Sequence, residues 1–223
     1  MRGLTMAAFA VIAVASARAQ AAAQPAPNAT LDRAIAAYAK VKTVRASFTQ
    51  TITNPLLGRT FTSAGDVTQQ RPGYLSVRFT QPANDRIVAD GKYLWVYLPS
   101  STPGQVIRMP VGKGGAGVPD VTAQFLESPR TRYDIADAGR ATAAGRPARA
   151  LKLTARDSSL PFTTATVWVD DADALVRQFE VTDGSGVTRR VTISKLAVNG
   201  AVSRSTFTFA PPKGVRVFDQ GSP

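Results

Sequence analysis

Three aspartates, Asp170, Asp171 and Asp173, form the densest group of acidic side chains in the sequence. Clustered carboxylates can bind a divalent cation or act as an acid/base pair in glycoside hydrolysis. This group lies in "DDADA", at the end of a predicted strand, and lacks the glycine and the closing glutamate of a calcium-binding loop. We therefore expect a solvated turn here rather than a metal site.

Histidine and cysteine are absent from the sequence. Their absence excludes Ser-His-Asp and Cys-His nucleophilic sites, thiolate and imidazole metal ligands, and disulfides.

The stretch "GKGGAG" at residues 112–117 matches the dinucleotide fingerprint G-x-G-x-x-G. It lies between Pro110 and Pro119 and does not open a crossover helix, so we interpret it as a mobile loop. We predict no catalytic residue, no cofactor and no enzyme activity. A secreted enzyme that uses carboxylates alone is the alternative.

The predicted strand at residues 93–98 has no polar face. It follows Asp90-Gly91, which is a strong hairpin signal because a tight primed turn needs positive φ. Antiparallel sheets usually expose one face to water, so this strand needs a cover on both sides. The aromatic side chains point one way and the aliphatic ones the other: Tyr93, Trp95 and Tyr97 against Leu94, Val96 and Leu98.

The elements that position these residues are mostly strands. Ten or eleven strands in meander order predict one large antiparallel sheet, which must curl because strands twist. Thr30 is expected to cap a first helix at residues 31–41, and Asp120 a short helical stretch at 121–128. Two helices are too small to fill the curled sheet completely, which predicts a cavity. The first helix places apolar residues at helical spacing: Leu31, Ala34, Ile35, Tyr38 and Val41.

The beginning of the chain has the pattern of an export signal. A positive start and a short apolar run precede Ala17-Arg18-Ala19, so residues 1–19 are predicted to be a cleaved signal peptide. A retained membrane anchor is the alternative. Residues 20–30 are expected to form a flexible leader, and residues 31–223 a single exported domain.

The net charge is +12, or +10 without Arg2 and Arg18. The basic residues are scattered over strands, which disfavours nucleic acid and favours anionic membrane faces or an acidic partner.

A turn at residues 54–58, "NPLLG", contains Leu56 and Leu57. Turns are usually polar, so two leucines there predict contact with a partner or a membrane. The alternative is that both side chains fold back onto the core.

Four motifs in order resemble one family. They are "VRASFTQ" (44–50), "RPGYLSVRFTQP" (71–82), "VADGKYLWVYLP" (88–99) and "FTFAPPKGVRVFDQ" (207–220). Together they resemble the LolA family of periplasmic outer-membrane lipoprotein carriers, over residues 31–220. The resemblance implies a mainly β (α+β) fold, with one curled antiparallel sheet forming an unclosed β-barrel under a lid of short helices. At residues 100–120 the chain departs from it, with a Gly/Pro loop where lid-helix sequence is expected.

The resemblance also implies a function and partners. A monomeric carrier in the periplasm of a Gram-negative bacterium would shield the acyl chains of lipoproteins. An inner-membrane lipoprotein-releasing transporter would load it, and an outer-membrane lipoprotein receptor would unload it. Arg71 matches the family's arginine before proline, which implies bonds to lid carbonyls in the closed state. Candidates for the cavity wall are Phe48, Leu75, Val77, Phe79, Leu94, Trp95, Val96, Phe125, Leu126 and Phe179.

Two related functions remain open on the same fold. One is a periplasmic lipid-sensing regulatory module that binds a membrane protein. The other is a carrier of a different lipid, which the sequence does not distinguish from a lipoprotein carrier because all acyl chains present the same apolar surface.

Overall fold

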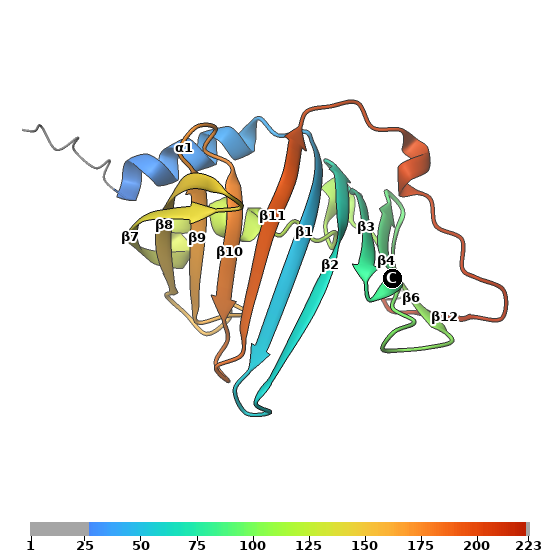
Figure 1. Ribbon diagram of the computed structural model, residues 1–223. Helices are drawn as coiled ribbons and strands as arrows, with labels where there is room; N and C mark the ends of the chain where they lie inside the picture. Colours follow the sequence, from blue (N-terminus) through green and yellow to red (C-terminus); the bar gives the residue numbers. More distant parts are fainter. Residues whose placement is uncertain (1–26, 222–223) are drawn as a thin grey trace, which may run out of the picture.

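In residues 27–221, which the computed structural model describes, twelve strands form one curled sheet (Figure 1). The strand order is β12-β6-β5-β4-β3-β2-β1-β11-β10-β9-β8-β7. The sheet is not closed, because β12 and β7 are its two edges. The strands are β1 (Thr43–Asn54), β2 (Arg59–Gln70), β3 (Tyr74–Gln81), β4 (Ala83–Asp90), β5 (Tyr93–Tyr97), β6 (Gln105–Pro110), β7 (Tyr133–Ala143), β8 (Arg146–Ala155), β9 (Thr164–Asp170), β10 (Val176–Thr182), β11 (Thr188–Val198) and β12 (Arg216–Asp219).

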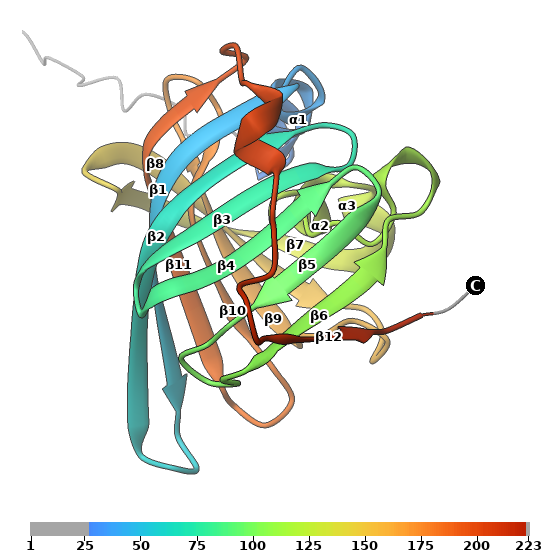
Figure 2. The same cartoon turned by 90° about the vertical axis from the view of Figure 1, so that its right-hand side faces the viewer.

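The predicted fold class is confirmed. All neighbouring strands pair antiparallel except β12, which runs parallel to β6. The helices are few and short: α1 (Pro27–Ala39), α2 (Ala123–Leu126), α3 (Pro129–Arg132) and the 3-10 helices η1 (Lys113–Gly115) and η2 (Arg204–Phe207). Figure 2 shows α2 and α3 behind the sheet, on its concave side, while η2 and the C-terminal segment cross its outer face. No helix within the described residues is long and apolar enough to cross a membrane.

Three predicted element assignments differ from the structure. The expected strand "STFTF" (205–209) is instead η2 and an extended segment, because serine and threonine hydroxyls bond to nearby backbone there. The Thr208 hydroxyl donates to the Ser205 carbonyl oxygen (2.8 Å), for example. Strand β7 was not predicted, since its Ala-, Gly- and Asp-rich sequence has low strand propensity. The four-residue β12 was not predicted either.

Helix α1 begins at Pro27, earlier than expected, so it includes residues 27–30 of the predicted leader. Proline is favoured in the first helical turn because its missing N–H would have no partner there. Thr30 is buried inside the helix and is not its N-cap. The predicted signal peptide and the rest of the leader lie outside the described residues.

The apolar core on the concave side consists of two clusters. In the larger cluster, α1 and α2 pack against β7–β11, and its fully buried members include Leu31, Phe125 and Leu153. The smaller cluster lies on β2–β6, around Leu75, Ala89 and Leu94. Because inward and outward side chains alternate along each strand, both clusters follow from the sequence periodicity.

Candidate functional site

Arg71 joins helix α1, the segment before α2 and the sheet. It lies in the turn between β2 and β3, where Nη1 donates to the carbonyl oxygens of Tyr38 (3.2 Å) and Val41 (3.1 Å). Nε donates to Oδ2 of Asp120 (2.9 Å), and Nη2 forms an ion pair with the same oxygen (2.8 Å). The guanidinium also lies 3.8 Å from the centre of the Tyr38 ring, a cation–π contact. One side chain thus binds elements that are distant in sequence.

Asp120 is the acceptor at the centre of this network. Besides Arg71, its Oδ2 accepts hydrogen bonds from the Tyr38 hydroxyl (3.0 Å) and the Gln69 amide (3.1 Å). Its Oδ1 accepts the backbone N–H groups of Thr122 (3.1 Å) and Ala123 (3.0 Å), in the turn that leads into α2. The N-cap of α2 is Thr122 and not Asp120 as predicted. Burial, and then the Asp120 carboxylate, raise the pKa of the Tyr38 phenol, which therefore stays protonated and donates. We call Tyr38, Gln69, Arg71 and Asp120 the Arg71 network.

The Arg71 network is partly accessible to water. The side chains of Arg71 and Asp120 are 25% and 17% exposed. Each charge-assisted hydrogen bond stabilises a structure by about 1.5–3 kcal/mol, but water can replace partners at this exposure. Arg71 binds the carbonyls of Tyr38, in α1, and of Val41, just after α1. It binds the segment before α2 through the Asp120 carboxylate. At this exposure, separating Arg71 from Asp120 would leave both charges in contact with water.

Residues 111–126, which we call the cover segment, lie against the smaller cluster and the β2–β3 turn. Val111 and Val118 pack on the smaller cluster. Between them, Gly115 approaches Gly73 so closely that a Cβ there would lie 2.6 Å from the Gly73 nitrogen. The Gly112 N–H donates to the Ala116 carbonyl oxygen (2.9 Å). The stretch "GKGGAG" thus packs against the β2–β3 turn, and Gly115 permits the close approach to Gly73.

The predicted cavity residues occupy three places. Phe125, Leu126 and Phe179 are buried in the larger cluster, with Phe48 packed against it. Phe79 meets Phe48 edge-to-face, with ring centres 5.5 Å apart. The smaller cluster contains the remaining aliphatic candidates, Leu75, Val77, Leu94 and Val96.

Trp95 lies on the outer face, away from these residues. Its ring centre is 5.7 Å from that of Phe209, which also contacts Tyr97 at 6.0 Å. The Trp95 indole N–H donates to Asp90 (2.9 Å). Both faces of β5 are thus covered, the inner by the smaller cluster and the outer by the C-terminal segment. The sequence periodicity separated the two faces of β5 but did not identify Phe209 as the residue that covers the outer one. The prediction that Trp95 lines the cavity is wrong, because its side chain lies on the outer face.

The turn between β1 and β2 projects beyond the rest of the sheet (Figure 2). We call residues 54–61 the hairpin tip. Its apolar side chains Leu56, Leu57 and Phe61 are 78%, 64% and 51% exposed. The two leucines do not fold back onto the core, so the structure contradicts that alternative.

The aspartate group is a structural feature and only partly a solvated turn. Asp171 is exposed, but Asp170 is 1% exposed and forms ion pairs with Arg146 and Arg177. Burial alone raises the pKa of Asp170, but hydrogen bonds from Arg146, the Ala172 N–H and Arg177 outweigh it and hold the pKa well below its usual range. The carboxylate therefore fastens the end of β9 to β8 and β10.

Comparison with known proteins identifies relatives of this chain. A family model described as "Outer membrane lipoprotein carrier protein LolA" matches residues 39–210. An "Outer-membrane lipoprotein carrier protein" from Chromobacterium violaceum is 30% identical over 79% of this chain and 81% of its own length. Among solved structures, an uncharacterized conserved protein from Thermus thermophilus covers 86% of this chain and 98% of its own, with a TM-score of 0.54 and 14% identity. The MucA/MucB complex from Pseudomonas aeruginosa contains a chain matching at 14% identity and a TM-score of 0.50, over 82% of this chain and 61% of its own. These two structures share the fold.

Proposed function

The chain belongs to the LolA family, and on that basis we propose that it carries acylated lipoproteins through the periplasm from the inner to the outer membrane. The observation that carries this proposal is the concave side of the sheet, where apolar clusters lie under helices and the cover segment held by a polar network. In this proposal the protein is a monomeric, non-enzymatic carrier. It receives cargo from an inner-membrane transporter and gives it to an outer-membrane receptor.

A carrier is needed because acyl chains do not leave a bilayer readily. Each methylene that moves from water to an apolar environment contributes about 0.8 kcal/mol, so one long chain costs roughly 10 kcal/mol to expose. The inner wall offered to these chains comprises Phe48, Phe79 and the aliphatic residues of the smaller cluster. Phe125 and Leu126 of the cover segment would move with it and uncover the larger cluster.

The Arg71 network is the gate in this proposal. With cargo inside, the cover segment and α1 move away from the sheet, and the bonds of Arg71 to Tyr38, Val41 and Asp120 are broken. These bonds form again when the cargo leaves. Unloading loses the favourable free energy of burying the acyl chains. The bonds that re-form on closing offset part of this loss, so the cargo can be released as well as bound.

The hairpin tip is the contact with a partner or a membrane in this proposal. Leu56, Leu57 and Phe61 are exposed together at one end of the sheet, next to the exposed Arg59. Apolar side chains beside a cation fit an anionic membrane surface or an acidic partner protein.

Purification of the mature protein from periplasm, followed by mass spectrometry of the molecules bound to it, tests the carrier function. We expect intact triacylated or diacylated lipoproteins bound in a 1:1 complex. A variant with Val77→Trp, which fills the inner wall, should contain less of them. If the protein instead contains only free lipid, or nothing apolar, the lipoprotein function is contradicted. Free lipid alone would support the sensing module or the carrier of another lipid.

A further inference from the structure

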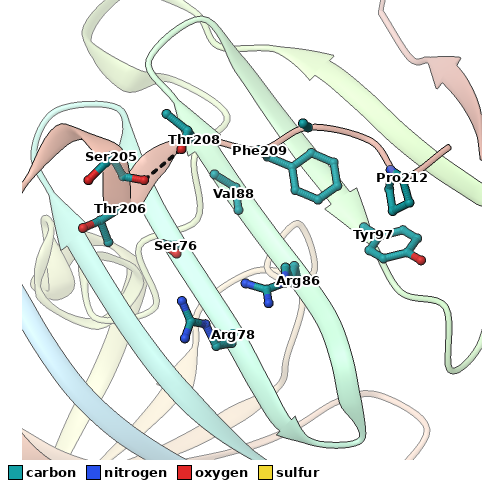
Figure 3. Close-up of a pocket in the computed structure, with 11 residues that line it drawn as sticks. Ser76, Arg78, Arg86, Val88, Tyr97, Ser205, Thr206, Thr208, Phe209 and Pro212 are labelled. Atoms are coloured by element: carbon teal, nitrogen blue, oxygen red, sulfur yellow. Dashed lines mark hydrogen bonds between the residues drawn. The ribbon is translucent and has the colours of Figure 1, made fainter.

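A pocket lies on the outer face of the sheet, where the C-terminal segment crosses β3, β4 and β5 (Figure 3). Its volume is about 310 Å³. The pocket and the inner wall lie on opposite faces of β3, because side chains alternate along a strand. Leu75 and Val77 point to the concave side, and Ser76 and Arg78 point into the pocket. The pocket is therefore separate from the proposed acyl-chain site and goes beyond the proposed function.

Two arginines face each other in this pocket. Arg78 on β3 and Arg86 on β4 are direct partners in the antiparallel register. Neither guanidinium forms an ion pair or hydrogen bond with another residue in the described part of the chain, whereas the guanidinium of Arg108 pairs with Asp219 and that of Arg190 with Glu180. Like charges opposite one another across two strands are destabilising. Asp66 is opposite Arg78 on β2, but its carboxylate accepts a hydrogen bond from the Ser47 hydroxyl (2.7 Å). An anion between the two arginines would reduce the repulsion that remains.

The rest of the polar wall also fits an anion. The hydroxyl-bearing residues Ser76, Ser205, Thr206 and Thr208 line the pocket, and no aspartate or glutamate does. The hydroxyls of Ser76 and Thr206 have no hydrogen-bond partner among residues 27–221, so both are available to donate. Val88, Tyr97 and Phe209 supply an apolar wall on the same pocket.

We propose that this outer pocket binds an oxyanion of the phosphate class between Arg78 and Arg86. Guanidinium groups present planar pairs of donors that match phosphate oxygens, and the hydroxyls complete the set. The phosphate can belong to a phospholipid headgroup, whose glycerol and upper acyl carbons would contact Phe209 and Tyr97, or it can be free inorganic phosphate.

The test measures binding of two probes to the full mature protein by isothermal titration calorimetry. They are inorganic phosphate and dihexanoyl phosphatidylglycerol below its micelle concentration, each at a fixed ionic strength set with sodium chloride. We expect saturable binding at one site. Tighter binding of the phosphatidylglycerol by tenfold or more identifies a lipid headgroup, and equal affinities identify free phosphate. Dihexanoyl phosphatidylcholine, whose headgroup is zwitterionic, should bind at least tenfold more weakly than the phosphatidylglycerol.

The critical variant is Arg78→Gln with Arg86→Gln, which should reduce the affinity for the better probe by at least tenfold. The matched control, Arg140→Gln with Arg216→Gln, removes the same charge from two exposed arginines elsewhere and should retain wild-type affinity. The better probe should also raise the melting temperature of the wild type and of the control, but not that of the pocket variant. Absence of saturable binding, or an equal loss of affinity in the control, would overturn the proposal.

Discussion

Two arginine–aspartate pairs in this protein differ in burial, and their physical roles differ accordingly. Arg71 and Asp120 are partly exposed, so their ion pair can be exchanged for water at modest cost. Asp170 and Arg177 are almost completely buried, so separating them would leave charges without solvent. The first pair suits a contact that opens and closes, and the second a permanent one. The same residue types thus form the proposed gate at Arg71 and a buried structural contact at Asp170.

The first prediction concerns Arg71→Leu. This variant should accept lipoprotein at least as well as the wild type but deliver it at least tenfold more slowly, because closing no longer reforms charge-assisted bonds. The measurement is the rate of transfer from the loaded carrier to receptor. Arg71→Lys is the control, since it retains the charge but not the planar fork of donors, and should be intermediate. Delivery by Arg71→Leu at the wild-type rate would show that Arg71 only stabilises the fold.

The second prediction concerns Asp170→Asn. At pH 7 this change should lower the free energy of unfolding by about 1–3 kcal/mol, because buried Arg177 loses one charged partner and keeps its ion pair with Asp173. The pKa of Asp170 is lower in the folded than in the unfolded state. Its stabilisation is therefore complete above the unfolded value of about 3.9 and is lost as the pH falls towards the folded value.

Urea unfolding at a series of pH values from 7 to 2 checks this prediction. The difference between wild type and Asp170→Asn should be constant down to about pH 4 and narrow below it. Asp171→Asn is the matched control, because Asp171 is exposed, and should behave like the wild type. A difference that stays constant down to pH 2 would show that the Asp170 carboxylate does not titrate as proposed.

At the scale of elements, the β1–β2 hairpin and the C-terminal segment differ in the exposure of their apolar side chains. The C-terminal segment places Phe209 against Trp95 and Tyr97 and leaves these rings only partly exposed. The hairpin tip leaves Leu56 and Leu57 exposed. The first element completes the fold, whereas the second contributes little burial to it and is available for contact with other molecules.

The third prediction follows from this exposure. Leu56→Ser with Leu57→Ser should change the free energy of unfolding by no more than about 0.5 kcal/mol, since exposed side chains contribute little to stability. Loading or delivery of lipoprotein should nevertheless fall. The control is Val217→Ser with Phe218→Ser on β12, two adjacent apolar residues that are 40% and 46% exposed; transfer should remain normal. A drop of several degrees in melting temperature would place the leucines in the core.

Features with a short sequence period were predictable at this scale. The alternation at residues 93–98 correctly separated Leu94 and Val96 from Trp95 and Tyr97, and the short helical stretch after Asp120 was recognised. The contact of Asp120 with Arg71 was not predictable, because the two residues meet only through the tertiary fold. The segment around Phe209 has the alternation of a strand, and no local signal indicates that it crosses the outer face instead.

At the scale of the whole molecule, the two faces of the sheet differ in chemistry. The concave face contains both apolar clusters, under α1 and the cover segment. The outer face contains the pocket with Arg78 and Arg86. Because side chains alternate along each strand, the same strands β3–β5 supply both faces, and a substitution on one face changes the other only through the backbone.

The fourth prediction tests the concave face directly. The mature protein should bind a hydrophobic fluorescent probe that long-chain fatty acids displace, and Arg71→Leu should bind the probe more tightly because its cover opens more easily. Val77→Trp should reduce probe binding, whereas Lys152→Trp, at an exposed position on β8, should not. Fluorescence titration measures all four proteins. No probe binding by the wild type would contradict an apolar cavity.

The strand order has a consequence for how the chain reaches this structure. Most strands pair with a neighbour in sequence, but β1 pairs with β11, which joins Val44 to Val198 in the centre of the sheet. Closing so long a loop is entropically costly and slows folding. When the chain emerges N-terminus first, β1 therefore keeps one unpaired edge until nearly the whole sequence has appeared. During that interval the edge can pair with the wrong strand or with another chain. Until β11 is made, the chain would thus depend on another protein, such as a chaperone, to cover the edge of β1.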